Sequence, residues 1–527
     1  MEKQATERED DGDSNSMDRI SNLPHPILHH ILSFLFQDEA VKTSVLSKSW
    51  RYLWCSRPKI EFSETYFGGN TEAFMSVLHN TLQRYYDQKL YLQKFSIAMS
   101  LVDSEPLSLL EKWIPRILID MGVRTFDLSS LSLKPACFDF PSVVFEAESL
   151  KHLYLESCKL NPKPLDKVLF KHLKTLSLKR VYIAEETLEK ILSSCPLIEY
   201  LVLSQCEGLK TIKVNKPHNI KYFDFSDYLD YRADRDITIE VEINVETLET
   251  IRIEGAPNWF QSHHHKYFPY LKSLYLDNVR LSTKSFDSFS CNFPCLEELS
   301  LFFCSGFEEF QVVIDVPNIV SFHYEGDIPR SISFTTASSE WKSDIVVWSN
   351  VNFDYDASSW CLKLNELLKA LSESEISLDI QHCMGNPHVE EPPNLLVADN
   401  TCGGFYEPVV VGHLHLSLSG HSFFSLSALM NNLFCICRPR VIRDRYLYAD
   451  LQSEWEREHT QLTELLCEIL LMETETRHYL WQRDLEEVST EAFDENGVEW
   501  NPVMGTSLPN NQSVQPIRFR LKWRELS

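Results

Sequence analysis

Apolar residues recur along most of the chain in a repeated pattern. Between residues 150 and 324 the pattern is L-x-x-L-x-L, in which Ile, Phe or Tyr can replace Leu. Its first positions, which lie 22 to 28 residues apart, are Leu150, Leu173, Ile198, Ile220, Leu248, Leu271, Leu296 and Ile319. Alternation at the end of each copy is typical of a short strand with one buried face. The pattern therefore predicts a stack of repeats that each contribute one strand.

Weaker copies of this pattern extend it in both directions. Earlier copies lie at 123–128 and, more loosely, at 92–97. Further on, the sequence predicts a helix at 362–371, strands at 376–380 and 413–418, helical structure over 453–488 and a last strand at 517–523. We expect the C-terminal part to cap the final repeat, because a stack of repeats needs a polar-faced end.

Residues 18–54 follow the helical period instead. The apolar positions of the first predicted helix are Leu23, Ile27, Leu28, Ile31, Leu32 and Leu35. Two more short helices are predicted after it, with Asp38 and Ser47 as their N-caps. A module this short cannot bury a self-sufficient core, so its surplus of apolar residues is expected to bind a partner.

A longer period overlies the repeats. Leu150, Leu173 and Ile198 each have a counterpart 98 residues later, at Leu248, Leu271 and Leu296. A duplicated block of about four repeats and an alternation of two repeat types both explain this period. Cys158, Cys206 and Cys304 each follow the last apolar position of a repeat by three residues, and we expect them to be buried, reduced thiols in the turns.

Charge and cysteine content limit the class of partner. The formal net charge of −26 argues against a nucleic-acid surface and against binding to an anionic membrane. The 14 cysteines lie along the whole chain without a compact disulfide spacing, which indicates a reducing compartment, the cytoplasm and/or the nucleus. Residues 1–17 are acidic and polar and are expected to form a disordered tail.

Few residues are candidates for chemistry. His263, His264 and His265 are adjacent, so they cannot easily all face one metal ion, and a solvated loop is expected there. Cys435 and Cys437 lack the spacing of zinc or redox sites. A basic cluster, which we expect to be solvated or ion-paired, consists of Arg438, Arg440, Arg443 and Arg445. The sequence predicts no metal site, no cofactor and no catalytic residue.

Residues 18–54 resemble the F-box, as it occurs in plant F-box/leucine-rich-repeat proteins. The matching residues are Leu23-Pro24, Ile27-Leu28, Ile31-Leu32, Ser33 to Leu35, Val41, Thr43 to Ser47, Trp50-Arg51 and Leu53-Trp54. The fold implied is α/β: a three-helix F-box at 18–60, a leucine-rich-repeat solenoid (a horseshoe) at 90–437, clearest at 123–325, and a C-terminal cap at 438–527.

The resemblance also implies a function. It is that of the substrate-recognition subunit of an SCF-type cullin–RING ubiquitin ligase, with no active site of its own. The F-box would bind a Skp-type adaptor, and through it cullin, by Leu23, Pro24, Ile27, Leu28, Ile31, Leu32 and Leu46. The alternatives are an adaptor-binding scaffold without a role in degradation and a co-receptor for a hormone or small molecule.

The repeats would bind a protein substrate through their concave face. Residues that alternate with the buried ones point to that face. The proposed substrate-binding residues are Tyr154, Tyr200, Tyr222, Asp224, Glu254, Tyr275, Asp277, Glu298, Phe302 and Glu325. Acidic residues on this face outnumber Lys179 and Arg252, its only bases, so the sequence predicts a substrate that presents basic and apolar residues.

Overall fold

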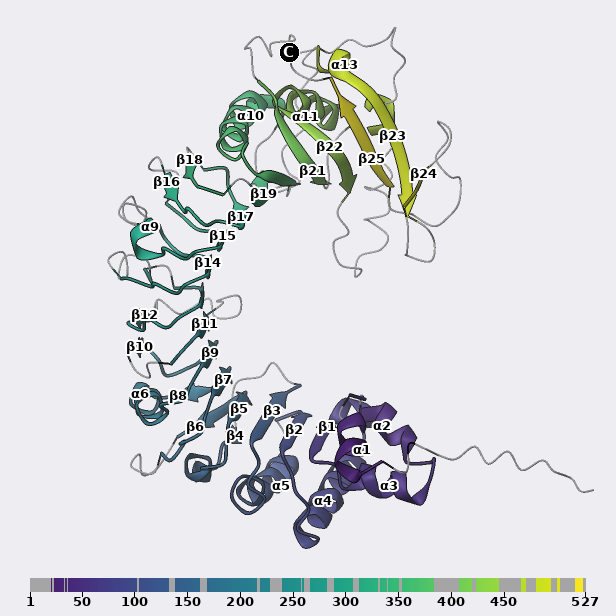
Figure 1. Cartoon of the computed structure of the whole chain (residues 1–527), viewed down its shortest axis with the longest axis vertical. Coiled ribbons are helices and arrows are strands. Elements are labelled where there is room, and N and C mark those ends of the chain that lie inside the picture. The colour runs from purple at the N-terminus through teal and green to yellow at the C-terminus, as the bar shows by residue number, and fades with distance from the viewer. Residues whose placement is uncertain are drawn as a thin grey trace, which may run out of the picture. The chain divides into compact units, whose positions relative to one another are not determined.

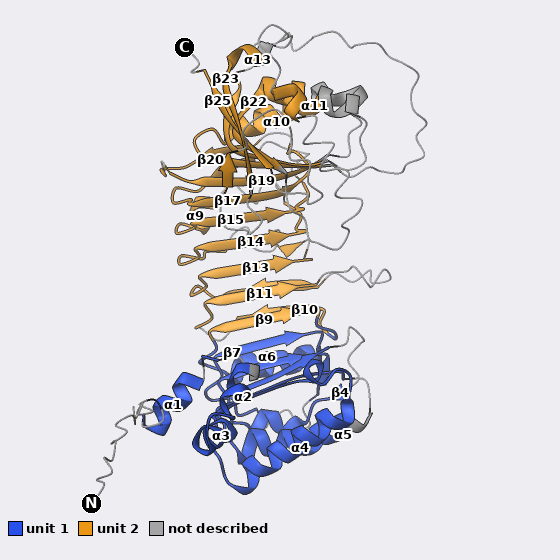
Figure 2. Cartoon of the chain, turned by 90° about the vertical axis from the view of Figure 1, so that its right-hand side faces the viewer, with its two compact units in different colours: residues 1–198, 206–208 blue, residues 199–205, 209–527 orange. Residues whose placement is uncertain are grey.

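The computed structural model describes residues 20, 23–32, 34–35, 37–101, 104–131, 138–161, 168–215, 219–227, 239–256, 258–259, 266–281, 289–306, 312–329, 332–338, 340–349, 353–382, 407–418, 423–444, 466–470, 480–493, 500–502 and 517–524. The chain forms two compact units, residues 1–198 with 206–208 (unit 1) and residues 199–205 with 209–527 (unit 2), shown in Figure 2. This division falls inside the repeats, so the predicted domain boundaries at 60, 90 and 437 stay a prediction. The predicted tail at 1–17 lies outside the described residues.

Unit 1 begins with three short helices, α1 (His25–Leu32), α2 (Gln37–Thr43) and α3 (Lys48–Cys55) (Figure 1). Ser47 caps α3 as predicted, because its hydroxyl oxygen accepts a hydrogen bond from the Trp50 N–H at 3.2 Å. The predicted cap at Asp38 is wrong, since α2 already begins at Gln37. The three helices share a small core of Leu28, Leu32, Ala40, Trp50 and Leu53.

A parallel sheet follows in unit 1. Its strands, in order, are β1 (Lys59–Ser63), β2 (Lys94–Met99), β3 (Thr125–Ser130), β5 (His152–Glu156) and β7 (Thr175–Lys179). A second, small parallel sheet consists of β4 (Phe138–Asp139), β6 (Cys158–Leu160) and β8 (Tyr182–Ile183). The weaker repeats predicted at 92–97 and 123–128 are confirmed as β2 and β3. β1 extends the same sheet by a strand that the repeat pattern did not predict.

Helical segments connect the strands of unit 1. They are η1 (Glu64–Phe67), α4 (Thr71–Asp87), α5 (Ser104–Pro115), the π-helical η2 (Arg116–Asp120), η3 (Ser142–Glu146) and α6 (Glu185–Ser194). α4 buries Phe74, Leu78 and Leu82, which follow the helical period. Trp113 of α5 is fully buried, and its indole N–H donates to His79 Nδ1 of α4 at 3.2 Å, so this polar group is satisfied.

Unit 2 continues the pattern of one parallel strand per repeat. The strands in order are β9 (Tyr200–Ser204), β11 (Tyr222–Ser226), β13 (Thr250–Glu254), β14 (Ser273–Asp277), β15 (Glu298–Phe302), β17 (Ser321–Gly326), β19 (Lys342–Ser349), β20 (Glu375–His382), β21 (Val409–Leu418) and β22 (Cys437–Asp444). Figure 2 shows them stacked in chain order. Two further pairs are β10 (Thr211–Val214) with β12 (Glu240–Ile243) and β16 (Val312–Asp315) with β18 (Ile332–Thr335).

In the C-terminal part of unit 2, the strands pair antiparallel instead of parallel. β25 (Ile517–Trp523) pairs antiparallel with β22 on one side and with β23 (Leu485–Phe493) on the other, and β24 (Trp500–Pro502) pairs with β23. Helices described in unit 2 include α9 (Phe289–Asn292), α10 (Phe353–Ala370), α11 (Phe423–Ile436) and α13 (Leu480–Asp484). The predicted last strand is confirmed. The prediction of helix through residue 488 is wrong, because Leu485 to Val488 pair with β25.

The predicted apolar positions of the repeats lie in the core. The first positions of the eight repeats, from Leu150 to Ile319, are all 0% exposed. Removing such side chains from water is worth about 1.5–3 kcal/mol each. The helix predicted at 362–371 overlaps α10 up to its end at Ala370, and the strands predicted at 376–380 and 413–418 lie within β20 and β21.

The turns after the strands repeat with the 98-residue period. Ser157, Arg180 and Gln205 have left-handed φ angles of 53°, 52° and 51°. Their counterparts 98 residues later, Gly255, Asn278 and Phe303, have φ angles of 74°, 53° and 46°. The period therefore extends from the apolar positions to backbone conformation.

The repeat cysteines are free thiols that follow the left-handed turn residues, with Cys158 at the start of β6. The Sγ atoms of Cys206 and Cys304 donate to the carbonyl oxygens of Leu178 at 3.5 Å and Leu276 at 3.6 Å. Predicted burial is confirmed for Cys158 and Cys206, while Cys304 is partly exposed. Burial nevertheless raises the pKa of the Cys304 thiol to about 12, so it is protonated at neutral pH.

Candidate functional site

Two surfaces are candidates for function, and the first lies on the three N-terminal helices. Of the proposed adaptor-binding residues, Leu28 and Leu32 are 0% and 3% exposed and belong to the helical core. Leu23 and Ile31 pack against that core and are partly buried. The role of these four in an interface stays a prediction, and the structure gives them a packing role.

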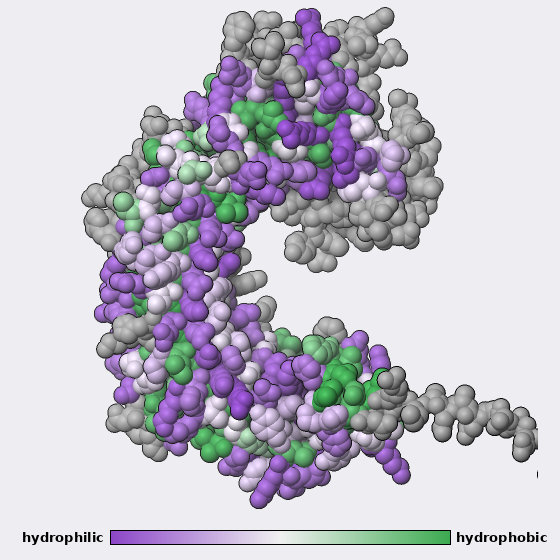
Figure 3. All heavy atoms as spheres, in the orientation of Figure 1, coloured by the Kyte–Doolittle hydropathy of each residue, from purple (hydrophilic) through white to green (hydrophobic). Residues whose placement is uncertain are grey.

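Other apolar side chains of these helices face water. Ile27 is 47%, Leu46 66% and Val45 84% exposed, and Pro24 is exposed as well. Figure 3 shows hydrophobic side chains gathered over this part of unit 1. Leu46 and Val45 lie in the turn between α2 and α3. The backbone N–H groups of both residues donate hydrogen bonds to carbonyl oxygens of α2. Exposed side chains of this size indicate a binding surface.

Sequence reasoning left two members out of this surface. Phe34, between α1 and α2, and Val45 are among its most exposed apolar residues. Neither lies on the helical period, so a search for helical spacing misses them. The signal that finds them is a large apolar residue that directly follows a serine in a short turn, as in Ser33-Phe34 and Ser44-Val45.

The second candidate surface is the exposed face of the strands. In unit 1, Tyr154 is partly exposed on this face, and the neighbouring acid is already neutralised. Glu156 pairs with Lys179 Nζ at 3.2 Å and with Arg180 Nη2 at 2.9 Å, and it accepts a hydrogen bond from the Ser130 N–H. The carboxylate of Glu156 therefore has a structural role.

In unit 2 the exposed face begins with aromatic residues. The rings of Tyr200 and Tyr222 lie 5.9 Å apart, and the Tyr222 hydroxyl donates to Asp224 Oδ2 at 3.0 Å. Burial raises the pKa of Asp224, although the hydrogen bond and the charge of Arg252 oppose the rise. Burial and the neighbouring Asp224 raise the pKa of Tyr222 to about 12, so the phenol stays a donor.

Arg252 occupies the next position on this face. The pairing of β11, β13 and β14 places Asp224, Arg252 and Tyr275 side by side in adjacent strands. Arg252 Nε lies 3.6 Å from Asp224 Oδ2, and the guanidinium carbon lies 4.0 Å from the centroid of the Tyr275 ring. This guanidinium is held by one carboxylate and one aromatic face, a favourable cation–π arrangement.

A second row of side chains lies on the same face, two positions further along the strands than Arg252 and Tyr275. The pairing of β13, β14, β15 and β17 aligns Glu254, Asp277, Phe302 and Glu325, which we call the acidic row. The Phe302 ring stacks on Tyr275 at 4.9 Å and 26°. Glu325 accepts a hydrogen bond from the Trp348 indole N–H of β19 at 3.0 Å.

The negative charge of the acidic row is only partly compensated by its neighbours. Burial, Asp277 and Asp224 raise the pKa of Glu254, and burial and Glu325 raise the pKa of Asp277. The charge of Arg252 opposes both rises, and a hydrogen bond that the Tyr275 hydroxyl donates to Asp277 Oδ2 at 3.3 Å opposes the second. Within the part of the chain that the structure describes, no Lys or Arg forms an ion pair with Glu254, Asp277 or Glu325. Carboxylates that are partly desolvated and repel one another favour a cation from outside.

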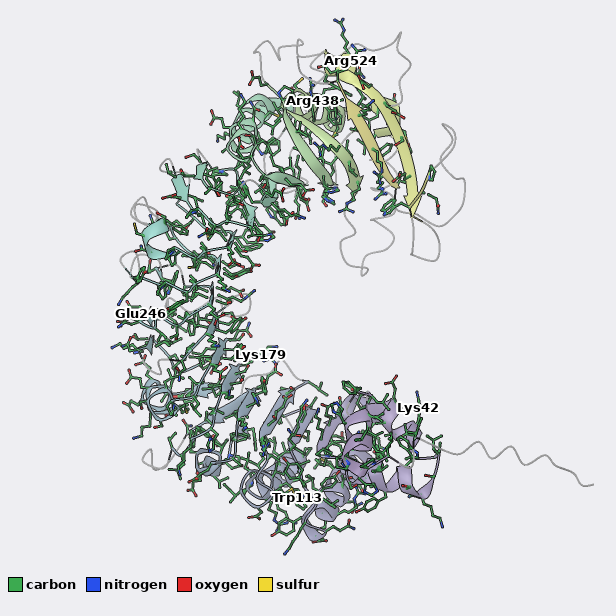
Figure 4. All side chains as sticks on the ribbon, in the orientation of Figure 1. Lys42, Trp113, Lys179, Glu246, Arg438 and Arg524 are labelled. Carbon is green, nitrogen blue, oxygen red and sulfur yellow. The ribbon has the colours of Figure 1, made fainter. Side chains whose placement is uncertain are left out.

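The remaining predicted charges are placed differently. Glu298 is exposed at the start of β15. Arg438 is buried, pairs with Asp484 and donates to the carbonyl oxygen of Arg524, near which it lies in Figure 4. Arg443 donates to His415 Nε2, and Arg445 lies outside the described residues. The prediction of ion pairing is confirmed for Arg438.

His263 to His265 lie outside the described residues, and among the residues that are described no cluster of His, Cys, Asp or Glu is arranged to hold a metal ion. Within the same residues, no helix is both long and apolar enough to cross a bilayer.

Comparison with known proteins identifies the family of this chain. A family model described as the F-box domain matches residues 20–62, and one described as "FBD-associated F-box protein At5g56370, LRR repeats" matches residues 110–257. F-box/LRR-repeat protein 25 of Arabidopsis thaliana is 34% identical over 202 residues, which cover 38% of this chain and 73% of that protein. The chain belongs to the plant F-box/leucine-rich-repeat family. The exposed apolar surface of α1 to α3 is thus the surface of an F-box, and the parallel strands are those of leucine-rich repeats.

Other F-box/leucine-rich-repeat relatives match over a smaller share of their length. Putative F-box/LRR-repeat protein At3g18150 is 33% identical over 38% of this chain and 41% of its own. F-box/FBD/LRR-repeat protein At1g13570 is 31% identical over 41% of this chain and 49% of its own. Both are from Arabidopsis thaliana. Proteins of this family are typically non-catalytic, and the architecture suits a substrate-recognition adaptor: an F-box implies binding to a Skp-type adaptor, and leucine-rich repeats imply binding to proteins.

Proposed function

We propose that this chain is the substrate receptor of an SCF-type cullin–RING ubiquitin ligase in the cytoplasm and/or the nucleus. The F-box binds a Skp-type adaptor and through it cullin, and the repeats bind a protein substrate. The observation that carries the proposal is the exposed apolar surface of Pro24, Ile27, Val45 and Leu46 on an F-box that has its own core.

The physical contribution of such a receptor is proximity. The ubiquitin-conjugating enzyme performs the transfer, and the receptor raises the local concentration of a substrate lysine near the reactive thioester. No nucleophile, general base or metal is needed in this chain. The substrate side of the proposal rests on the strand face of unit 2, with Tyr200, Tyr222 and Tyr275 as aromatic anchors.

Proximity labelling in plant cells, with and without a proteasome inhibitor, tests this function. Proteins labelled by the wild-type chain should accumulate when the proteasome is inhibited. With Ile27→Ala plus Leu46→Ala they should still be labelled but no longer depend on the proteasome, and Tyr91→Ala plus Leu131→Ala, a pair of exposed residues elsewhere in unit 1, should behave as wild type. Labelled proteins whose abundance ignores both the inhibitor and the F-box variant would identify a scaffold instead.

A further inference from the structure

The exposed strand face of unit 2 already binds one guanidinium group, that of Arg252. Arg252 sits against the Tyr275 ring at 4.0 Å and beside Asp224 at 3.6 Å. A planar guanidinium suits this setting better than an ammonium group, because it stacks on a ring and can donate to a carboxylate at the same time. Arg252 belongs to the chain, so it occupies only one of two neighbouring sets of acids and rings.

The second set has the same components, and in the described part of the chain no cation forms an ion pair with its carboxylates, although Asp277 accepts a hydrogen bond from the Tyr275 hydroxyl at 3.3 Å. Phe302 stacks on Tyr275, and Asp277 and Glu325 lie in the strands on either side of it. Ser300 and His323 follow Tyr275 in the central row, so Ser300 places a small side chain beside both rings. Trp348 adds a third aromatic group, since its indole N–H is bonded to Glu325 and its ring lies 6.0 Å from that of Phe303.

We infer that the acidic row binds an arginine side chain presented by the substrate protein. The arginine would stack on the exposed side of Phe302 and pair with Asp277 and Glu325, much as Arg252 stacks on Tyr275 and pairs with Asp224. Charge complementarity supports this occupant, because the three carboxylates of the row have no ion-pair partner in the described part of the chain. That the arginine belongs to a ubiquitination substrate rests on the proposed function.

The inference is tested on the purified full-length chain without adaptor. The probe is a fluorescein-labelled peptide, Gly-Ser-Arg-Gly-Ser-Arg-Gly-Ser, compared with the same peptide carrying citrulline or lysine in place of arginine. Fluorescence anisotropy at low salt should show the arginine peptide binding about tenfold more tightly than the citrulline peptide, with lysine in between.

Matched variants separate the row from general attraction to an acidic protein. Asp277→Asn plus Glu325→Gln should abolish the preference for arginine, and Phe302→Leu should reduce it, with the melting temperature checked for each. The control is Glu240→Gln plus Glu246→Gln, which removes the same charge from exposed residues; Glu246 lies on the other side of the strands in Figure 4.

Three results would overturn the inference: equal binding of the arginine and citrulline peptides, equal binding of the arginine and lysine peptides, or equal loss in the row variant and the control. None of them bears on the F-box, because adaptor binding is measured separately and should be unchanged in every row variant. A failure of the proposed function would conversely leave the peptide result intact.

Discussion

Gly255, directly after β13, has a backbone conformation that few residues other than glycine adopt. Its φ angle is 74°, and a Cβ atom there would lie 2.5 Å from the carbonyl oxygen of Asp227 in the preceding repeat. Gly255→Ala combines a left-handed conformation with a clash against backbone that cannot move independently. We expect it to lower the free energy of unfolding by roughly 1–3 kcal/mol.

Gly68 provides the control for this prediction. Its φ angle is 58°, but a Cβ atom would meet nothing within 4 Å. Gly68→Ala carries the conformational cost alone and should be the milder change when both are compared by chemical denaturation. A Gly255→Ala protein as stable as the Gly68→Ala protein would show that the repeat can relax around the clash.

Glu254 is a second single residue with a testable effect, because its ionisation should make the stability of the protein depend on pH. Its folded-state pKa is raised above the ordinary value of 4.5, so ionisation of Glu254 destabilises the folded state at neutral pH. The penalty is lost as the pH falls through the raised pKa, where the folded state takes up the proton first. Glu254→Gln should therefore raise the melting temperature at pH 7, and the gain should shrink in mildly acidic buffer.

A series of melting curves against pH checks this behaviour. Glu246→Gln, at an exposed site outside the acidic row, serves as the control. A gain for Glu254→Gln that does not change with pH, or one that Glu246→Gln reproduces, would contradict the assigned cause. Stability that improves when a binding group is removed is common at functional sites.

At the scale of elements, the F-box divides into a core and a surface. Leu28 of α1 is completely buried among the three helices, whereas Val45 in the α2–α3 turn is 84% exposed. Leu28→Ala should lower the free energy of unfolding of the F-box by about 2–5 kcal/mol. Val45→Ala should leave it within about 0.5 kcal/mol, since it removes no core contact.

Hydrogen exchange on the full chain measures both changes in the F-box itself. The amides of α1 to α3 should exchange faster in the Leu28→Ala protein and at the wild-type rate in the Val45→Ala protein. Equal effects of the two substitutions would remove the distinction between core and surface on which the choice of interface variants depends.

The repeat strands could be predicted because each depends on its own residues. Three apolar positions at fixed spacing bury one face of a strand, and a parallel neighbour adds only hydrogen bonds to it. β23 could not be predicted in this way, because Leu485 and Val488 fit a helix as well as a strand and the deciding partner, β25, lies about thirty residues later. β1 was missed because Lys59–Ser63 has one buried apolar residue, Ile60, instead of a repeat motif.

The candidate surfaces were predictable to a similar extent. Alternation placed Tyr275, Asp277 and Phe302 on the exposed face, and burial of the intervening residues confirms that orientation. The stacking of Arg252 on Tyr275 and the hydrogen bond from the Trp348 indole to Glu325 depend on how the strands align. That alignment could not be read from the sequence alone. In the F-box, both Leu28 and Ile27 were predicted to bind the adaptor, because both fit the helical spacing. Only Ile27 faces water.

At the scale of the whole molecule, one chain carries two candidate binding surfaces. An apolar F-box surface on unit 1 suits a structured protein partner, and the acidic and aromatic strand face of unit 2 suits a basic segment. Since the net charge is −26, salt should weaken binding at the strand face more than binding at the F-box, which is mainly apolar. Each surface can therefore be measured without the other.

The affinity of the purified full-length chain for a purified Skp-type adaptor tests the central claim most directly. Isothermal titration should show one-to-one binding that Ile27→Ala plus Leu46→Ala weakens at least about tenfold, as expected for the loss of two buried aliphatic contacts. Tyr91→Ala plus Leu131→Ala should bind like the wild type. A folded wild-type chain that does not bind the adaptor, or that binds it equally well with both pairs of substitutions, would contradict the account.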